Sequence, residues 1–299
     1  MIRSMALLMA LAVVTAAQAL TVFPDPIGFL DLRPVETTVS NSLKGAVHTI
    51  TLTEHQPGRD GMRVIVTKRT FDTDGYETAM EKYTDGKLIK SVTRIYEPNH
   101  QSAKTTTKSV MTKYVKGPEG KMIPSGEAET EVKIVKSTYD TKGLLVKEVQ
   151  YQESGQIYEV RTYSCVNGRV VKCTQTDAQG TVLYITTYTR DQYGNLISTE
   201  SKSPDGMGFE GSSGKTIYDY ATNTMFCYNT EFRYSNDSLL TQATSWKDAT
   251  RTGTPVGVLN MTYTFDAAGN WITRNTIRKS SKPEETITDT REITYYPAK

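Results

Sequence analysis

The sequence predicts an all-β protein: an antiparallel β-meander of repeated hairpins that forms one long curved or partly rolled sheet. Three observations predict this class. A turn pattern of Asp, two variable residues and Gly recurs along the chain, the segments between the turns are rich in Val, Ile, Thr and Tyr, and helical patterns are weak. Because short turns can only join antiparallel neighbours, a meander follows.

Each position of the recurring turn has a physical reason. An Asp carboxylate accepts a hydrogen bond from the backbone N–H two residues on, which suits the first position of a type I turn. Gly suits the last position, where φ is often positive and a Cβ would clash. The residue before Asp is mostly aromatic, and we expect it to end a strand and pack on the sheet. The turn Asp residues are Asp72, Asp140, Asp177, Asp191 and Asp266.

The spacing of the turns sets the length of the strands. The central glycines Gly143, Gly155, Gly168, Gly180 and Gly194 are separated by 12, 13, 12 and 14 residues. With about four residues per turn, each strand has roughly seven to ten residues, an ordinary length. We expect positive φ at four turn glycines: Gly143, Gly180, Gly194 and Gly269.

The hairpin "YSCVNGRVVKC" constrains the cysteines. With Asn167 and Gly168 at its tip, Cys165 and Cys173 are offset by three residue pairs, roughly 10 Å. This exceeds the Cα separation of about 7 Å that a disulfide allows. Either cysteine could instead join Cys227, or all three are reduced thiols that fill packing positions. The expected pairs are Val166 with Arg169, Cys165 with Val170 and Cys173 with Thr162.

The N-terminus "MIRSMALLMALAVVTAAQAL" has the pattern of a secretory signal peptide. Arg3 provides the positive charge, an apolar run follows, and "AQA" at 17–19 is a small-x-small cleavage site. The alternative, a membrane anchor, needs about 20 apolar residues, and this run is shorter. We therefore expect a signal peptide over 1–19 and an exported chain that begins at Leu20 and is periplasmic, cell-surface or secreted.

One β domain is expected over 20–299, with two loop insertions where the repeat breaks. Residues 97–130 contain three prolines with Lys and Thr, and residues 203–215 read "SPDGMGFEGSSGK". The basic run at 104–121 is typical of a solvated loop, with a binding patch as the alternative. The net charge of +2 gives no concentrated basic face, so we expect no nucleic-acid partner.

The turn units resemble the YD-repeat, or RHS-repeat, family. "YDTKGLLVKEVQY", "RDQYGNLISTESK" and "FDAAGNWITRNTI" match its aromatic-Asp-x-x-Gly-x-hydrophobic turn and the strand after it. The resemblance covers 71–88, 138–202 and 262–296, and the end of the chain looks like the terminal repeat of short secreted bacterial members. Large members wind such strands into shells around a toxin domain, a function not carried over here. The motif residues are structural in that family and imply no catalytic site.

No catalytic, cofactor-binding or metal-binding residues are predicted. His48 and Glu54 share a strand face but lie about 20 Å apart along an extended chain, too far for one metal, and His55 faces the other way. His100 belongs to no cluster. "GFEGSSGKT" at 208–216 fails the P-loop pattern because Phe209 stands where Gly is required. No cofactor is expected.

We therefore expect a non-enzymatic β-repeat protein of the bacterial envelope or exterior, a scaffold or a glycan- or protein-binding module. Rows of Tyr could bind glycans by stacking, although cross-strand packing explains them equally. One alternative is an envelope-polymer hydrolase, which needs carboxylates that converge in a cleft. A further alternative is an outer-membrane β-barrel, which needs apolar side chains at every second position. "LLVKEVQY" argues against it, because Lys147 and Glu148 fall on opposite faces.

Overall fold

The computed structural model describes residues 43–58, 61–97, 102–116, 122–142, 144–204, 216–236, 239–281 and 283–297. Within these ranges the chain is all-β, as predicted. The strands are β1 Val47–Gly58, β2 Gly61–Phe71, β3 Glu77–Thr84, β4 Lys87–Tyr96, β5 Ser102–Lys116, β6 Met122–Tyr139, β7 Leu145–Tyr151, β8 Ile157–Val166, β9 Arg169–Asp177, β10 Val182–Arg190, β11 Leu196–Lys202, β12 Ile217–Asp219, β13 Thr224–Cys227, β14 Thr230–Tyr234, β15 Leu240–Ser245, β16 Gly257–Phe265, β17 Trp271–Ser280 and β18 Glu285–Tyr295.

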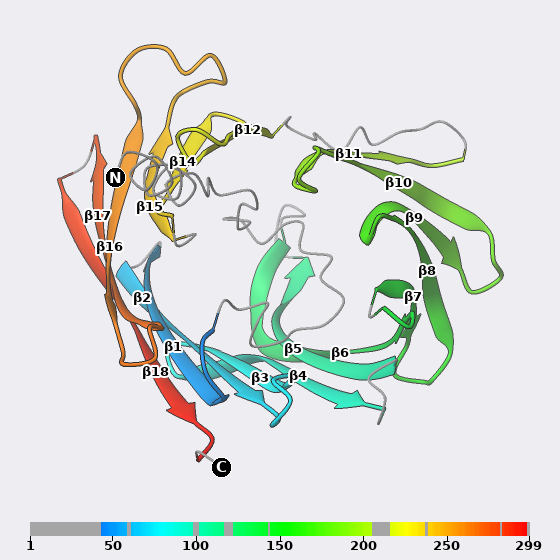
Figure 1. Cartoon of the computed structure of the whole chain (residues 1–299). Coiled ribbons are helices and arrows are strands. Elements are labelled where there is room, and N and C mark those ends of the chain that lie inside the picture. Colours follow the sequence, from blue (N-terminus) through cyan, green and yellow to red (C-terminus); the bar gives the residue numbers. More distant parts are fainter. Residues whose placement is uncertain are drawn as a thin grey trace, which may run out of the picture.

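The sheet is an antiparallel meander that rolls into a nearly closed ring (Figure 1). From β1 to β11, and again from β12 to β18, each strand pairs with the next. The roll is completed because β18 pairs with β1, and Ile293 lies opposite Ile50. No helix in the described part of the chain is long and apolar enough to cross a membrane.

The junction between β11 and β12, called the seam below, is held differently from the rest of the ring. Among the described residues, one backbone hydrogen bond crosses it, from Thr216 N to Ile197 O at 2.9 Å. Side chains supply the other links across it: the Tyr218 hydroxyl donates to Leu196 O at 2.9 Å, and the Asn195 amide donates to the Tyr220 hydroxyl at 2.9 Å. The seam therefore depends on tyrosines where other neighbours depend on a backbone ladder.

The predicted turn chemistry is confirmed at the described turns. Asp177 Oδ1 accepts hydrogen bonds from the N–H groups two and four residues on, and the N–H of Gly180 closes the turn on Asp177 O at 3.2 Å. Asp72, Asp140 and Asp191 bind backbone N–H groups at the same two positions. Positive φ is confirmed at Gly180, Gly194 and Gly269, whereas Gly143 lies outside the described residues.

A β-bulge precedes the residue before each of these turns and determines the face of the sheet on which its side chain lies. The register shifts between Thr70 and Phe71, and again between Thr138 and Tyr139. Phe71 and Tyr139 are buried, as expected of the aromatic residue in this position. At the last turn the same shift precedes Phe265, but its side chain is 49% exposed, so the packing expected there is wrong.

The loop insertion expected at 97–130 is wrong for its described residues. Residues 102–116 form β5 and residues 122–130 begin β6, and the two strands pair as one long hairpin. The proline, lysine and threonine composition suggested a loop, but the segment is also rich in Thr and Val, which are common in strands. The insertion at 203–215 and the signal peptide at 1–19 lie outside the described residues, apart from residues 203–204.

The cysteine hairpin matches the prediction at its tip. Asn167 and Gly168 both have positive φ, and Val166 pairs with Arg169 and Cys165 with Val170, as expected. A bulge then shifts the register, so Cys173 pairs with Tyr163 and not with Thr162. The three cysteines are free thiols.

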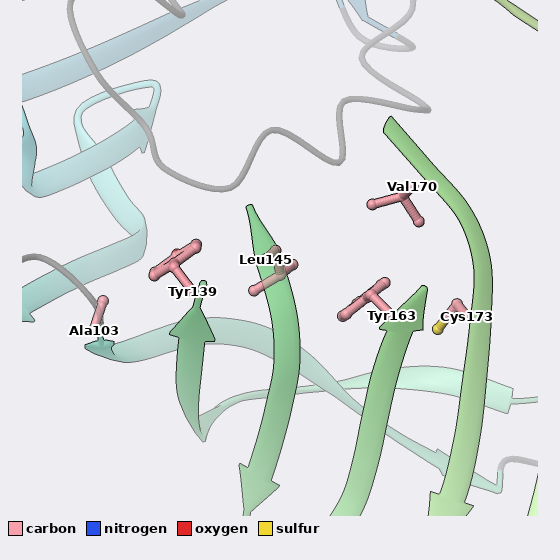
Figure 2. Packing of buried hydrophobic residues seen from close by; sticks show 6 residues of the cluster. All are labelled: Ala103, Tyr139, Leu145, Tyr163, Val170 and Cys173. Atoms are coloured by element: carbon pink, nitrogen blue, oxygen red, sulfur yellow. The ribbon is translucent and has the colours of Figure 1, made fainter. Parts of the chain in front are cut away.

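The two faces of the rolled sheet differ in burial. Nearly all buried strand residues lie on one face, for example Ile50, Val92 and Tyr163. Because a rolled sheet crowds the side chains on its concave side, we call this the inner face and the other the outer face. Figure 2 shows Val170 and Cys173 of β9 directed toward the same side as Tyr163 of β8, in a cluster that also contains Ala103, Tyr139 and Leu145.

Candidate functional site

The inner face carries two groups of charged and aromatic side chains, and together they are the candidate site. The first group lies on β6 to β9, where cross-strand pairing aligns Ser137, Glu148, Arg161 and Gln175 in one row. Tyr163 and Glu159 occupy the adjacent rows of the same face. We call these six residues the acidic network.

Both carboxylates of the acidic network have partners at each oxygen. The Tyr163 hydroxyl donates to Glu148 Oε2 at 2.6 Å, and Ser137 donates to Glu148 Oε1 at 3.5 Å. Arg161 forms an ion pair with Glu159 Oε1 at 2.6 Å, and the Gln175 amide donates to Glu159 Oε2 at 2.7 Å. Burial, together with the adjacent Glu148 carboxylate, raises the pKa of Tyr163. The tyrosine therefore remains a hydrogen-bond donor, and the network is arranged to hold the sheet.

The second group, the Arg–Trp cluster, lies where the ends of the sheet meet. It consists of Arg69 on β2, Arg274 and Trp271 on β17, and Asp289 and Arg291 on β18. Arg274 donates to Asp289 Oδ2 from Nη2 at 2.8 Å and from Nε at 3.0 Å, and its Nη2 is 3.4 Å from Glu54 Oε1. The closure of β18 onto β1 brings these strands together.

Arg291 has the most unusual environment in the cluster. Its guanidinium carbon lies 3.6 Å from the centre of the Trp271 ring, a cation–π contact. Its Nε is the one buried side-chain nitrogen or oxygen without a hydrogen-bond partner among the residues described. Burial, then the charges of Arg274 and Arg69, lower the pKa of Arg291 to about 10.

A buried ion triad adjoins the cluster on the same face. Glu77 is fully buried and its Oε2 binds Arg69 Nη1 at 2.6 Å, while its Oε1 binds Arg94 Nη1. The Tyr96 hydroxyl donates to the backbone oxygen of Glu77 at 2.9 Å. The ion pair with Glu77 holds the Arg69 side chain in place and offsets part of its positive charge.

The residues weighed as metal ligands are not brought together. His48 lies at a bulge of β1 and its ring contacts that of Tyr296, with centroids 4.6 Å apart. His55 Nδ1 is 2.8 Å from the backbone oxygen of Thr288. No group of three His, Cys, Asp or Glu within the described ranges could hold a metal ion. His100 and residues 208–215 lie outside those ranges.

Comparison with protein-family models and with curated proteins gave no match. Among solved structures, the fold is similar to a porin-like protein from Bacteroides uniformis, with 13% sequence identity and a TM-score of 0.44. The alignment covers 84% of this chain and 99% of that one. A likeness at this level does not extend to function.

Proposed function

We propose that this chain is an exported, non-enzymatic binding protein of the bacterial envelope or exterior, which holds its ligand against the inner face of the ring. The observation that carries the proposal is the difference between the two faces. The inner face combines buried tyrosines, stacked arginines and ion pairs, while the outer face presents exposed lysines such as Lys104, Lys136 and Lys147 among threonines. Envelope glycans and proteins are the ligand classes that suit such a surface.

The non-enzymatic part of the proposal is supported by the acidic network. A hydrolase would need a carboxyl group that is able to reach substrate. Glu148 and Glu159 instead have all four carboxyl oxygens engaged by neighbouring side chains. These contacts favour a structural role for both residues.

Membership of the YD-repeat family is also proposed. Its support is local: the turns at Asp72, Asp177, Asp191 and Asp266 share one hydrogen-bond pattern, in which the Gly N–H closes on the Asp oxygen. In a repeat architecture the repeated turns and strands form the scaffold, and side chains on one face of the sheet bind the ligand.

An outer-membrane β-barrel is the second candidate, and the pairing of β18 with β1 favours it. This pairing leaves neither β1 nor β18 as an exposed sheet edge, and a membrane-spanning barrel requires that its edges be paired. The chemistry of the outer face weighs against it, because a lipid-facing band excludes charges and Lys104 lies directly opposite Lys136 on that face. Detergent-free extraction decides between the two: a water-soluble ring is released from the cells by osmotic shock, whereas a barrel stays with the outer-membrane fraction.

Charge reversal on each face tests the binding proposal with a matched control. Lys82 pairs with Lys90 on the inner face, and Lys104 pairs with Lys136 on the outer face. The double variant K82E/K90E is expected to weaken binding to envelope glycans or proteins on an array at least about ten-fold. The variant K104E/K136E, with the same change in charge, is expected to bind as the native chain does. Equal loss in both variants, or binding by neither native protein nor variants, contradicts the proposal.

A further inference from the structure

The Arg–Trp cluster and the adjoining triad hold one more positive than negative charge. Four guanidinium groups, Arg69, Arg94, Arg274 and Arg291, share three carboxylates, Glu54, Glu77 and Asp289. Glu77 is used by Arg69 and Arg94, and Asp289 and Glu54 are used by Arg274. Among the described residues Arg291 is left with the Trp271 ring as its partner.

An excess buried positive charge and an unpaired N–H lower the stability of the fold unless a further group supplies a negative charge and an acceptor. A buried N–H without an acceptor loses its hydration without compensation, and a cation that is crowded by other cations is disfavoured further. The low pKa of Arg291 reflects the same cost. The contact with Trp271 offsets part of the charge, but an aromatic face beneath the guanidinium plane gives no acceptor in the plane of Nε.

We propose that Arg291 is a binding site for a carboxylate group of a ligand held inside the ring. The guanidinium carbon lies 3.6 Å from the centre of the Trp271 ring, and Nε lacks an acceptor in the described part of the chain. A carboxylate is the group that binds a guanidinium with two parallel hydrogen bonds. A ligand with one negative charge balances the single excess cation, whereas a doubly charged phosphate would leave excess negative charge beside Glu54 and Asp289. Arg291 is partly exposed as a residue, although its Nε is buried.

Trp271 is a built-in reporter for this site. The chain has two tryptophans, and Trp246 bonds to Asn229 through its backbone N–H and carbonyl oxygen, so W246F leaves those bonds intact. In the W246F background, titration with acetate, glucuronate or N-acetylglycine is expected to change Trp271 fluorescence saturably, with an affinity in the millimolar range typical of small fragments. A stronger response to glucuronate identifies a sugar source of the carboxylate, and a stronger response to N-acetylglycine a peptide source.

Three variants make the test decisive. R291M is expected to abolish the saturable response, and R291K, which keeps the charge without the planar fork, to weaken it at least about ten-fold. R278M removes an exposed arginine from β17, the strand that carries Trp271, and is expected to respond as the parent does. No saturable response in the parent, or an unchanged response in R291M and R291K, overturns the assignment. The inference rests on the proposed function, but array binding that persists in R291M would overturn this site alone.

Discussion

Tyr295 donates its phenolic proton to the carboxylate of Asp266, and Tyr220 makes the same bond to Asp191. Each pair is separated by 29 residues. In both, an Asn also donates its side-chain amide to the tyrosine oxygen, Asn270 to Tyr295 at 2.8 Å and Asn195 to Tyr220 at 2.9 Å. Each of these two turn Asp residues therefore has two roles: it accepts hydrogen bonds within its own turn and binds a tyrosine further along the chain.

Replacement of Tyr295 by Phe is expected to destabilise the protein by about 1 kcal/mol, because the hydrogen bond to a carboxylate is lost at a partly exposed site. Chemical denaturation in urea measures the change. Tyr158 on β8 is 55% exposed, so Y158F is the control and is expected to leave the stability unchanged. Equal stability of Y295F and the native protein would contradict a stabilising bond.

Stability is expected to fall as the pH drops below about 4, in part through Asp266. Burial on its own would raise the pKa of Asp266, but the hydrogen bonds from the Tyr295 hydroxyl and from the backbone N–H of Asn270 outweigh burial and lower the pKa. The unfolded chain then binds more protons than the folded chain in this window, so the contribution is present above the unfolded pKa and is lost as the pH falls through the folded pKa. Urea midpoints at pH 7, 4 and 3 should decline less steeply for D266N than for the native protein; parallel curves would exclude this contribution.

The seam is expected to exchange its amide hydrogens faster than the closure between β1 and β18. Six paired positions join β1 to β18, whereas one backbone bond joins residue 216 to β11. Hydrogen exchange followed by mass spectrometry should give peptides from 216–220 rates at least about ten-fold higher than peptides from 47–53. Equal protection of the two junctions would show that the seam is held as firmly as a ladder.

Replacement of Glu77 by Gln is expected to destabilise the fold by about 2 to 3 kcal/mol, because two arginines lose their shared carboxylate. The cost is moderated because Arg69 and Arg94 retain some access to water, with 31% and 17% of their side chains exposed. E200Q removes a glutamate from an exposed ion pair with Lys202 and is expected to change stability by less than about 0.5 kcal/mol. Similar losses in the two variants would contradict a special role for the buried triad.

The local rules predicted much of this fold. Asp and Gly at fixed offsets defined the turns, and the cysteine hairpin turns at Asn167 and Gly168, as the sequence indicated. Bulges were not predictable, since a shift of one residue, as at Cys173, depends on how the turn geometry meets the twist of the strands. The pairing of Ile50 with Ile293 has no local signal either, because it joins residues from opposite ends of the chain.

The candidate site was missed for the same reason. The pairing of β17 with β18 places Arg274 and Arg291 at Trp271, but only the closure of the ring brings Glu54 of β1 and Arg69 of β2 beside them. An alternating strand such as "ETITDTREITY" does place Asp289, Arg291 and Ile293 on one face, a weak signal that charges point inward. Without the identity of the neighbouring strands, that signal could not be distinguished from an ordinary solvated face.

The closure of the ring also places the first and last strands side by side, away from the edges at β11 and β12. Tyr296 N donates to Ala46 O at 2.8 Å, so in a chain trimmed to 46–296 a short linker could join the two termini, and new termini could be opened between β11 and β12. Such a circular permutant would run from β12 through β18 and β1 to β11, with every strand beside its sequence neighbour. Its contact order would be lower because the β1–β18 pairing becomes local, so it should refold faster than the native chain in stopped-flow experiments.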